Sequence, residues 1–111
     1  MARLTSHTLN GSDGTHAGHI GVTLVNTVSG EQMLSSTMDE GGRFAADIPA
    51  NTIDPAAIYE LIFDVRDYWV KRGTSARVQE IVLRFTMPDV QGAYHMPVIL
   101  NPNSYSVWVS S

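Results

Sequence analysis

Two histidines and an arginine are the side chains of this chain best suited to chemistry at neutral pH. The first, His95, interrupts a run at residues 93–100 in which every second residue is apolar. Because side chains alternate across a strand, we expect His95 on the face away from the core, where a site, a partner subunit or water must account for it. An imidazole can serve there as a general acid or base. The simpler interpretation of His95 is a hydrogen-bonded histidine at the surface or at an interface.

His7 and Arg43 are the other two. His7 alternates with Thr5 and Leu9 along a predicted strand, so these three side chains share a face. Arg43 directly follows a Gly-Gly pair, and a tight turn there projects its guanidinium from the start of a strand. A guanidinium can bind carbonyl oxygens bidentately and stabilise developing negative charge. The simpler interpretations are a surface or interface histidine and an exposed arginine beside a hairpin.

His16 and His19 are weaker candidates. They lie in a Gly-containing loop without the nearby carboxylate or Cys spacing that a metal site needs, so exposed loop histidines are favoured and no metal is expected. Ser6 is adjacent to His7, and the two side chains therefore face opposite sides of the strand. This placement excludes the pair as the start of a Ser-His-Asp triad.

The end of the chain carries a second unexplained side chain. Residues 105–109 alternate, so that Trp108 points away from the side shared by Val107 and Val109. If this run lies beside the strand at 93–100, the indole joins the His95 imidazole outside the core. A bulky aromatic ring there again calls for a ligand, a partner subunit or water.

The composition narrows the class of function. A chain of 111 residues is expected to form a single domain spanning 1–111. Its net charge of −4, with 7 Lys and Arg residues, leaves no basic patch for a nucleic-acid backbone. The sequence has no Cys, which excludes disulfides, iron–sulfur sites and thiol catalysis. A charged fraction of 16%, against about 25% in average soluble domains, favours an oligomer.

The sequence gives no targeting or membrane signal. The first residues lack the apolar core of a signal peptide. No apolar run reaches the ~18 residues of a transmembrane helix. We therefore expect a cytoplasmic protein with no membrane partner.

Short alternating runs separated by turn clusters predict an all-β fold, and an antiparallel sandwich of two sheets is the natural closure. Pro55 favours one helical turn at 54–57, because proline suits the first helical position. Tyr68 and Trp69 are expected to end the fifth strand and cover the edge of the sandwich. The predicted strands cover residues 3–9, 20–25, 32–38, 43–48, 59–66, 80–87, 93–100 and 105–111.

Taken together, these segments resemble the transthyretin-like proteins. The resemblance covers essentially the whole chain, in order. It implies a sandwich of two four-stranded sheets with one short helix. The segments that carry it are LTSHTL at 4–9, AGHIGVTL at 17–24, DEGGR at 39–43, and YHMPVILNP at 94–102 followed by Tyr105-Ser106.

The enzymatic branch of that family is 5-hydroxyisourate hydrolase, which opens a purine-derived ring and needs no cofactor. The resemblance places its catalytic residues at His7, Arg43 and His95. It also implies a homotetramer, built as a dimer of dimers, with the active sites in a channel between subunits. The hormone-carrier transthyretins lack this set of three residues, so their presence favours the enzyme.

The chain departs from the hydrolases at its end. The hydrolases finish on Tyr-Arg-Gly-Ser, whereas this chain has Trp108, Val109, Ser110 and Ser111, and Ala93 stands where a His is usual. An apolar corner accepts methyl groups but leaves polar ring edges unpaired, at a cost of about 1–3 kcal/mol each. We therefore expect these four substrate-binding residues to suit an N-methylated relative, such as trimethyl-5-hydroxyisourate from methylxanthine catabolism. The alternatives are a non-catalytic small-molecule carrier and an interaction module.

Overall fold

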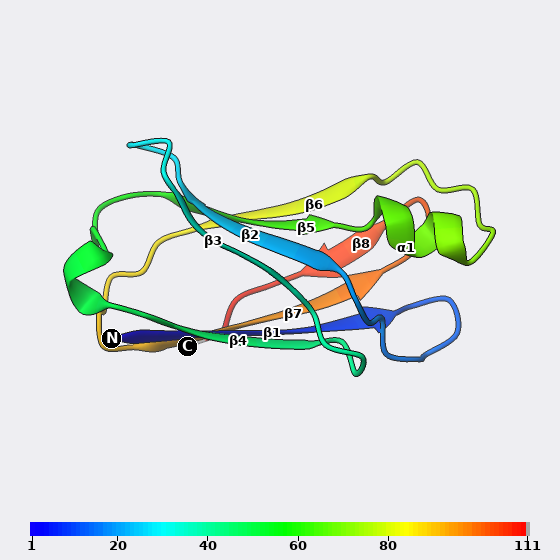
Figure 1. The fold of residues 1–111 in the computed structure, drawn as a ribbon, viewed down its shortest axis with the longest axis horizontal. Coiled ribbons are helices and arrows are strands. Elements are labelled where there is room, and N and C mark those ends of the chain that lie inside the picture. The colour runs from blue at the N-terminus through cyan, green and yellow to red at the C-terminus, as the bar shows by residue number, and fades with distance from the viewer. Residues whose placement is uncertain (111) are drawn as a thin grey trace.

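Eight strands form two four-stranded sheets in the computed structural model, which describes residues 1–110 (Figure 1). The first sheet has the order β4-β1-β7-β8 and the second the order β3-β2-β5-β6. The all-β class and the two-sheet sandwich predicted from the sequence are confirmed. The expectation of purely antiparallel pairing is wrong, because the strands Ala2–Asn10 and Ala93–Leu100 pair in parallel. The strands are β1 Ala2–Asn10, β2 Gly21–Asn26, β3 Gln32–Thr37, β4 Arg43–Ile48, β5 Tyr59–Asp64, β6 Glu80–Phe85, β7 Ala93–Leu100 and β8 Tyr105–Val107.

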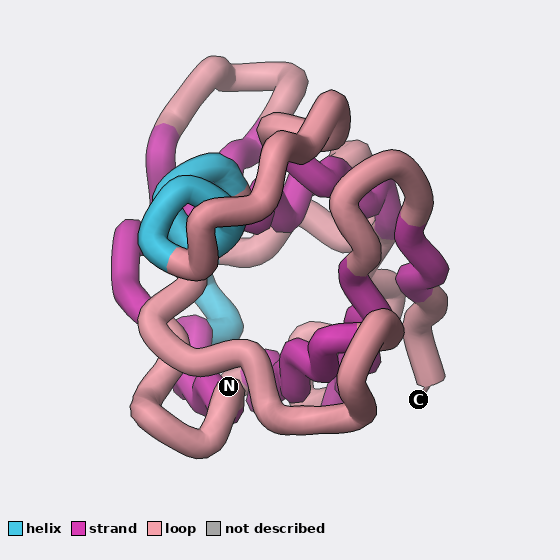
Figure 2. Tube along the Cα trace, turned by 90° about the vertical axis from the view of Figure 1, so that its right-hand side faces the viewer, coloured by secondary structure: helices cyan, strands magenta, loops and turns pink. Residues whose placement is uncertain are grey.

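The core lies between the two sheets and consists of the inward-facing members of each alternating run. Leu4 and Met96 come from the first sheet and Leu24 and Phe63 from the second, and each side chain is fully buried. Viewed along the long axis, the two layers of strands enclose the interior that such side chains fill (Figure 2). Burial of this apolar surface is the main force holding the sheets together.

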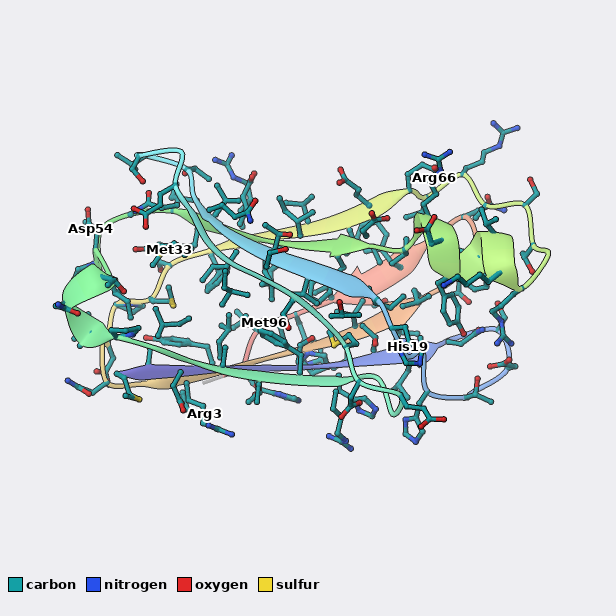
Figure 3. The ribbon with its side chains drawn as sticks, in the orientation of Figure 1. Arg3, His19, Met33, Asp54, Arg66 and Met96 are labelled. Atoms are coloured by element: carbon teal, nitrogen blue, oxygen red, sulfur yellow. The ribbon has the colours of Figure 1, made fainter. Side chains whose placement is uncertain are left out.

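The outer face of the first sheet is set by the alternation along β1. Even-numbered residues of β1 are buried and odd-numbered ones are exposed or half-buried. β1 pairs antiparallel with β4 and parallel with β7, so it lies in the middle of the sheet. Figure 3 shows the two faces: Arg3 projects outward from the sheet, whereas Met96 points into the space between the sheets. Every second residue of β1 and β7 is therefore available to a site on the outer face.

The short helix lies where the sequence suggested a strand end. α1 covers Arg66–Lys71 and contains Tyr68 and Trp69, and Trp69 is buried. The predicted turn at 54–57 is not α-helical, and a single 3-10 turn, η1, precedes it at Ala50–Thr52. A six-residue helix is shorter than two turns, so it leaves no periodic signal that could separate it from a strand.

Residues 1–110 include no helix that is both long enough and apolar enough to cross a membrane.

The last strand is shorter than predicted, but its register continues past its end. The Trp108 amide donates to the Pro97 carbonyl at 3.4 Å, and Ser110 forms a bridge with His95. Residues 108–110 thus still follow β7. Ser111 lies outside the described residues.

Candidate functional site

The structure brings the three predicted residues to the outer face of the first sheet. His7 on β1 lies directly opposite Arg43 on β4 in the antiparallel register. On the other side of β1, His95 of β7 is the register partner of Thr5. Thr5 and His7 are two residues apart and share a face, so all three side chains gather within about one strand spacing of β1. One central strand therefore assembles residues separated by up to 88 positions along the chain.

A threonine hydroxyl holds the imidazole of His95. The Oγ1 of Thr5 lies 2.8 Å from the Nδ1 of His95 in a partly buried hydrogen bond. A hydroxyl can either donate to a bare ring nitrogen or accept from a protonated one. The contact therefore fixes the ring while remaining compatible with either tautomer of His95. Within residues 1–110 no hydrogen bond engages Nε2, the other ring nitrogen, so it is available to a ligand.

His7 is held by a second histidine. Its Nε2 lies 2.9 Å from the Nδ1 of His16, and the two ring centroids are 5.0 Å apart. Burial lowers the pKa of His7 below its ordinary value, and the charges of Arg43, His16 and His95 lower it further, while the Gly41 backbone raises it. A lowered pKa keeps the imidazole neutral, and so able to accept a proton, to a lower pH.

Arg43 begins β4 immediately after a tight turn. The Asp39 carboxylate accepts from the backbone N–H of Arg43 at 2.8 Å, and Gly42 adopts a φ of +74°. A Cβ at Gly42 would lie 2.5 Å from the Thr8 carbonyl oxygen, so only glycine fits. Of the ion pairs formed within residues 1–110, none includes Arg43. The turn thus fixes the backbone and leaves the exposed guanidinium free to bind an oxygen ligand.

Two shallow hollows, open to solvent, flank His95. The first has a volume of about 240 Å³ and the second about 320 Å³, at or below the lower end of ordinary ligand pockets, roughly 300 Å³. His7 lines neither hollow, and Thr5 and His95 line both. The first is lined by Thr5, Ser6, Asp39, Arg43, Phe44, Ala45 and His95, and the second by Arg3, Thr5, Ala93, Tyr94, His95 and Ser110.

The end of the chain reaches this site through its backbone. Ser110 and His95 exchange two backbone hydrogen bonds of 2.9 Å, which place Ser110 on the rim of the second hollow. The same register puts Trp108, 47% exposed, beside Pro97 on the outer face. Val109, between them, points to the opposite side of the strand. Neither Trp108 nor Val109 lines either hollow. Ser111, the fourth predicted binding residue, is outside the described residues.

The arrangement combines two imidazoles with a free guanidinium, a set suited to proton transfer and oxyanion stabilisation. Residues 1–110 hold no group of three or more His, Asp or Glu side chains that could bind a metal ion. Ser6 is buried and donates to the Met96 carbonyl at 2.6 Å, on the opposite side of the strand from His7, as the alternation predicted.

Sequence reasoning did not assign roles to Thr5 and His16. Thr5 shares a face with His7 in the alternating pattern, so pairing β1 with β7 in the correct register would have revealed its contact with His95. No sequence signal could have found the contact between His16 and His7, because it depends on how a loop folds back.

Comparisons with known proteins agree with this architecture. Residues 4–109 match the family model described as the HIUase/Transthyretin family. A 5-hydroxyisourate hydrolase from Ralstonia nicotianae is 33% identical in an alignment of 117 positions that covers 100% of both chains. The solved structure of a Klebsiella pneumoniae 5-hydroxyisourate hydrolase matches over 100% of both chains with a TM-score of 0.83 and 24% identity. This likeness is evidence for the fold alone.

A transthyretin from Sparus aurata is similar in the same way, with a TM-score of 0.80 and 27% identity over 97% of each chain. Fold likeness alone therefore does not separate the two branches. The family match extends over residues 4–109, nearly the whole sequence. The chain belongs to the HIUase/Transthyretin family.

Proposed function

We propose that this protein is a cyclic-amide hydrolase that opens the ring of 5-hydroxyisourate or of an N-methylated relative. The observation that carries the proposal is the gathering of His7, Arg43 and His95 on one face of β1. The relative from Ralstonia nicotianae, which matches the chain along its full length, is a 5-hydroxyisourate hydrolase. Together they favour ring opening over simple binding.

The mechanism assigns a separate task to each residue. His7 acts as the general base and removes a proton from the attacking water, because its pKa is lowered by burial and by Arg43, so that it is neutral. The water oxygen bonds to the ring carbonyl carbon, and the guanidinium of Arg43 stabilises the resulting oxyanion. His95 gives a proton to the departing ring nitrogen as the C–N bond breaks. The products are a carboxylate and a free N–H.

The end of the chain favours an N-methylated substrate, such as trimethyl-5-hydroxyisourate formed in methylxanthine catabolism. Trp108 offers a flat apolar surface on the outer face, against which a methylated ring can stack. Ala93, on the rim of the second hollow, adds no polar group there. Because Val109 points to the opposite side of the strand, the proposal rests on Trp108 rather than on Val109, with Ser110 on the rim of the second hollow.

The open hollows support a homotetramer, a dimer of dimers, with the sites in a channel between subunits. Neither hollow encloses a ligand on its own, so a second surface is needed to exclude water from the reaction. Tyr105 and Trp108 are each more than two-fifths exposed near the last strand. Exposed aromatic residues of this kind are typical of interfaces. Light scattering after gel filtration should give four times the 12.1 kDa subunit mass.

The alternative is a non-catalytic carrier. The fold is also similar to that of the Sparus aurata transthyretin, so the fold alone does not exclude this alternative. A coupled assay decides between them: urate and trimethylurate are oxidised enzymatically, and the decay of each hydroxyisourate is followed with and without the protein. An enzyme accelerates the decay, and His7→Ala or Arg43→Ala removes the acceleration. A carrier binds the ring without accelerating its decay, and that result would overturn the proposal.

A further inference from the structure

The loop segment at 15–17 pairs with β1 on the same edge as β4, just beyond the point where β4 begins. β4 begins at Arg43, opposite His7, and two residues further along β1 an isolated bridge joins Leu9 to His16. His16 thus follows Arg43 along the same edge of β1. Because Leu9 and His7 share the outer face, the bridge delivers the His16 side chain to that face.

Backbone hydrogen bonds on both sides of His16 fix this segment. The Asn10 amide donates to the Thr15 carbonyl at 2.8 Å, and the Ala17 amide donates to the Thr8 carbonyl at 3.0 Å. The buried Thr8 hydroxyl donates to the Ala17 carbonyl at 2.6 Å. His16 therefore sits in a short stretch of strand pairing, even though it belongs to a loop.

A second anchor holds the loop from the other side. The Asp13 carboxylate accepts from the amide of Thr15 at 3.0 Å and from its hydroxyl at 2.6 Å, and it pairs with Arg72 beyond α1. These hydrogen bonds and the Arg72 charge lower the pKa of Asp13, so the anchor stays ionised. The loop and α1 lie at the same end of the sandwich (Figure 1). The His16 backbone is thus held before any ligand arrives.

We propose that His16 is a positioning residue for His7, orienting its imidazole and selecting its tautomer through the contact between Nε2 of His7 and Nδ1 of His16. Between two neutral imidazoles, one of the two facing nitrogens must donate and the other must accept. The contact therefore holds a single proton, and its position sets the tautomer of His7. This inference rests on the proposed function, in which His7 is the general base. It assigns a role to a residue that touches no substrate.

His16 also contributes charge. The groups that face His7 are Arg43 from β4, His95 from β7, His16 from the loop and the backbone of Gly41. A protonated His16 repels a proton on His7, as Arg43 and His95 do. Removing the His16 imidazole should therefore raise the pKa of His7 toward its ordinary value.

Three variants test the proposal. His16→Leu removes the hydrogen bond, and His16→Asn keeps a polar atom near the position of Nδ1 but loses the charge. His19→Asn is the matched control: His19 is an exposed histidine of the same loop with a φ of +62°, which asparagine tolerates. For His16→Leu we expect kcat to fall about tenfold with KM nearly unchanged. His16→Asn should recover most of that loss, and the control should match the wild type.

Two further measurements separate positioning from a general loss of structure. The acid limb of the pH profile of kcat/KM should move to higher pH in both His16 variants and stay in place in His19→Asn. The imidazole ¹⁵N resonances of His7, recorded by NMR on the free protein, should report a different tautomer balance in His16→Leu. Wild-type kinetics and unchanged His7 resonances in His16→Leu would overturn the inference. If the wild type opens no hydroxyisourate, the proposed function fails, and the NMR comparison alone then decides the contact.

Discussion

The two histidines of the candidate site are held by partners of different chemistry. Thr5 meets His95 with a hydroxyl, whereas His16 meets His7 with a second imidazole. A hydroxyl can reverse its hydrogen bond by rotating, so His95 can pass between proton donor and acceptor without moving its ring. His7 lies instead among like charges, which suits a base.

The Thr5 hydroxyl should therefore matter more than its size. Thr5→Val keeps the shape of the side chain and removes the hydroxyl, and we expect kcat for ring opening to fall about tenfold because His95 loses its orientation. Thr5→Ser keeps the hydroxyl and should stay within about twofold of the wild type. Steady-state kinetics on the purified variants check this. Equal losses in both variants would contradict a role for the hydroxyl.

The pH dependence should report the lowered pKa of His7. Because burial, Arg43, His16 and His95 favour the neutral imidazole, the acid limb of the kcat/KM profile should lie below the ordinary histidine pKa, about 6.5. Activity is thus retained at neutral pH and lost as the pH falls and His7 gains a proton. In Arg43→Met, the residual activity should decline at a higher pH than in the wild type, since one repelling charge is gone. An acid limb whose midpoint lies above 6.5 in the wild type would contradict this assignment.

At the scale of elements, β1 and the turn before β4 build the site. β1 supplies His7 and Thr5, and its two neighbours bring Arg43 and His95 into register. The turn must pass so close to β1 that Gly42 cannot carry a side chain. The position of the Arg43 guanidinium therefore depends on the close backbone approach of Gly42 to Thr8, in which the Arg43 side chain takes no part.

Gly42→Ala should be costly for this reason. The substitution combines a left-handed φ of +74° with a Cβ 2.5 Å from the Thr8 carbonyl oxygen. We expect the free energy of unfolding to fall by about 3 kcal/mol. Gly30 is the control, since its φ of +76° is similar and no atom lies within 4 Å of the added Cβ. Gly30→Ala should cost only about 1 kcal/mol. Urea unfolding at one protein concentration measures both, and equal losses would show that the close approach is unimportant.

Alternation carried most of the prediction of these elements. It placed His95 on the outer face and put His7 and Ser6 on opposite sides of one strand, because a strand offers only two sides. It failed at α1, where Tyr68 and Trp69 belong to a helix too short to show a period. It also could not find His16, whose contact comes from a loop pairing back onto β1. Sequence patterns report which side a residue faces, and they do not report which distant segments become neighbours.

At the scale of the whole molecule, the site is half open. Its hollows are shallow, and the exposed Trp108 stands near the same face. Under the proposed function, one subunit supplies the reacting groups, and neighbouring subunits of the proposed tetramer close the site over them. The choice of substrate then depends on what the end of the chain contributes to the closed site.

Trp108 should control that choice. Trp108→Tyr restores the residue with which the hydrolase ending begins, and it adds a hydroxyl to an apolar surface. We expect the ratio of kcat/KM for trimethyl-5-hydroxyisourate to that for 5-hydroxyisourate to fall about tenfold. Val109→Arg should change the ratio less, because residue 109 points to the opposite side of the strand. If the ratio responds only to Val109→Arg, Trp108 does not determine the choice of substrate and residue 109 does.

The most direct test is the rate at which the wild-type protein opens the two rings. Each hydroxyisourate is generated in place by oxidation of its urate, and its decay is followed spectroscopically as the protein concentration is varied. We predict that the decay rate rises in proportion to protein for both rings and more steeply for the trimethylated one. Decay that is independent of protein concentration for both rings would contradict the assignment of His7, Arg43 and His95 as a hydrolytic site.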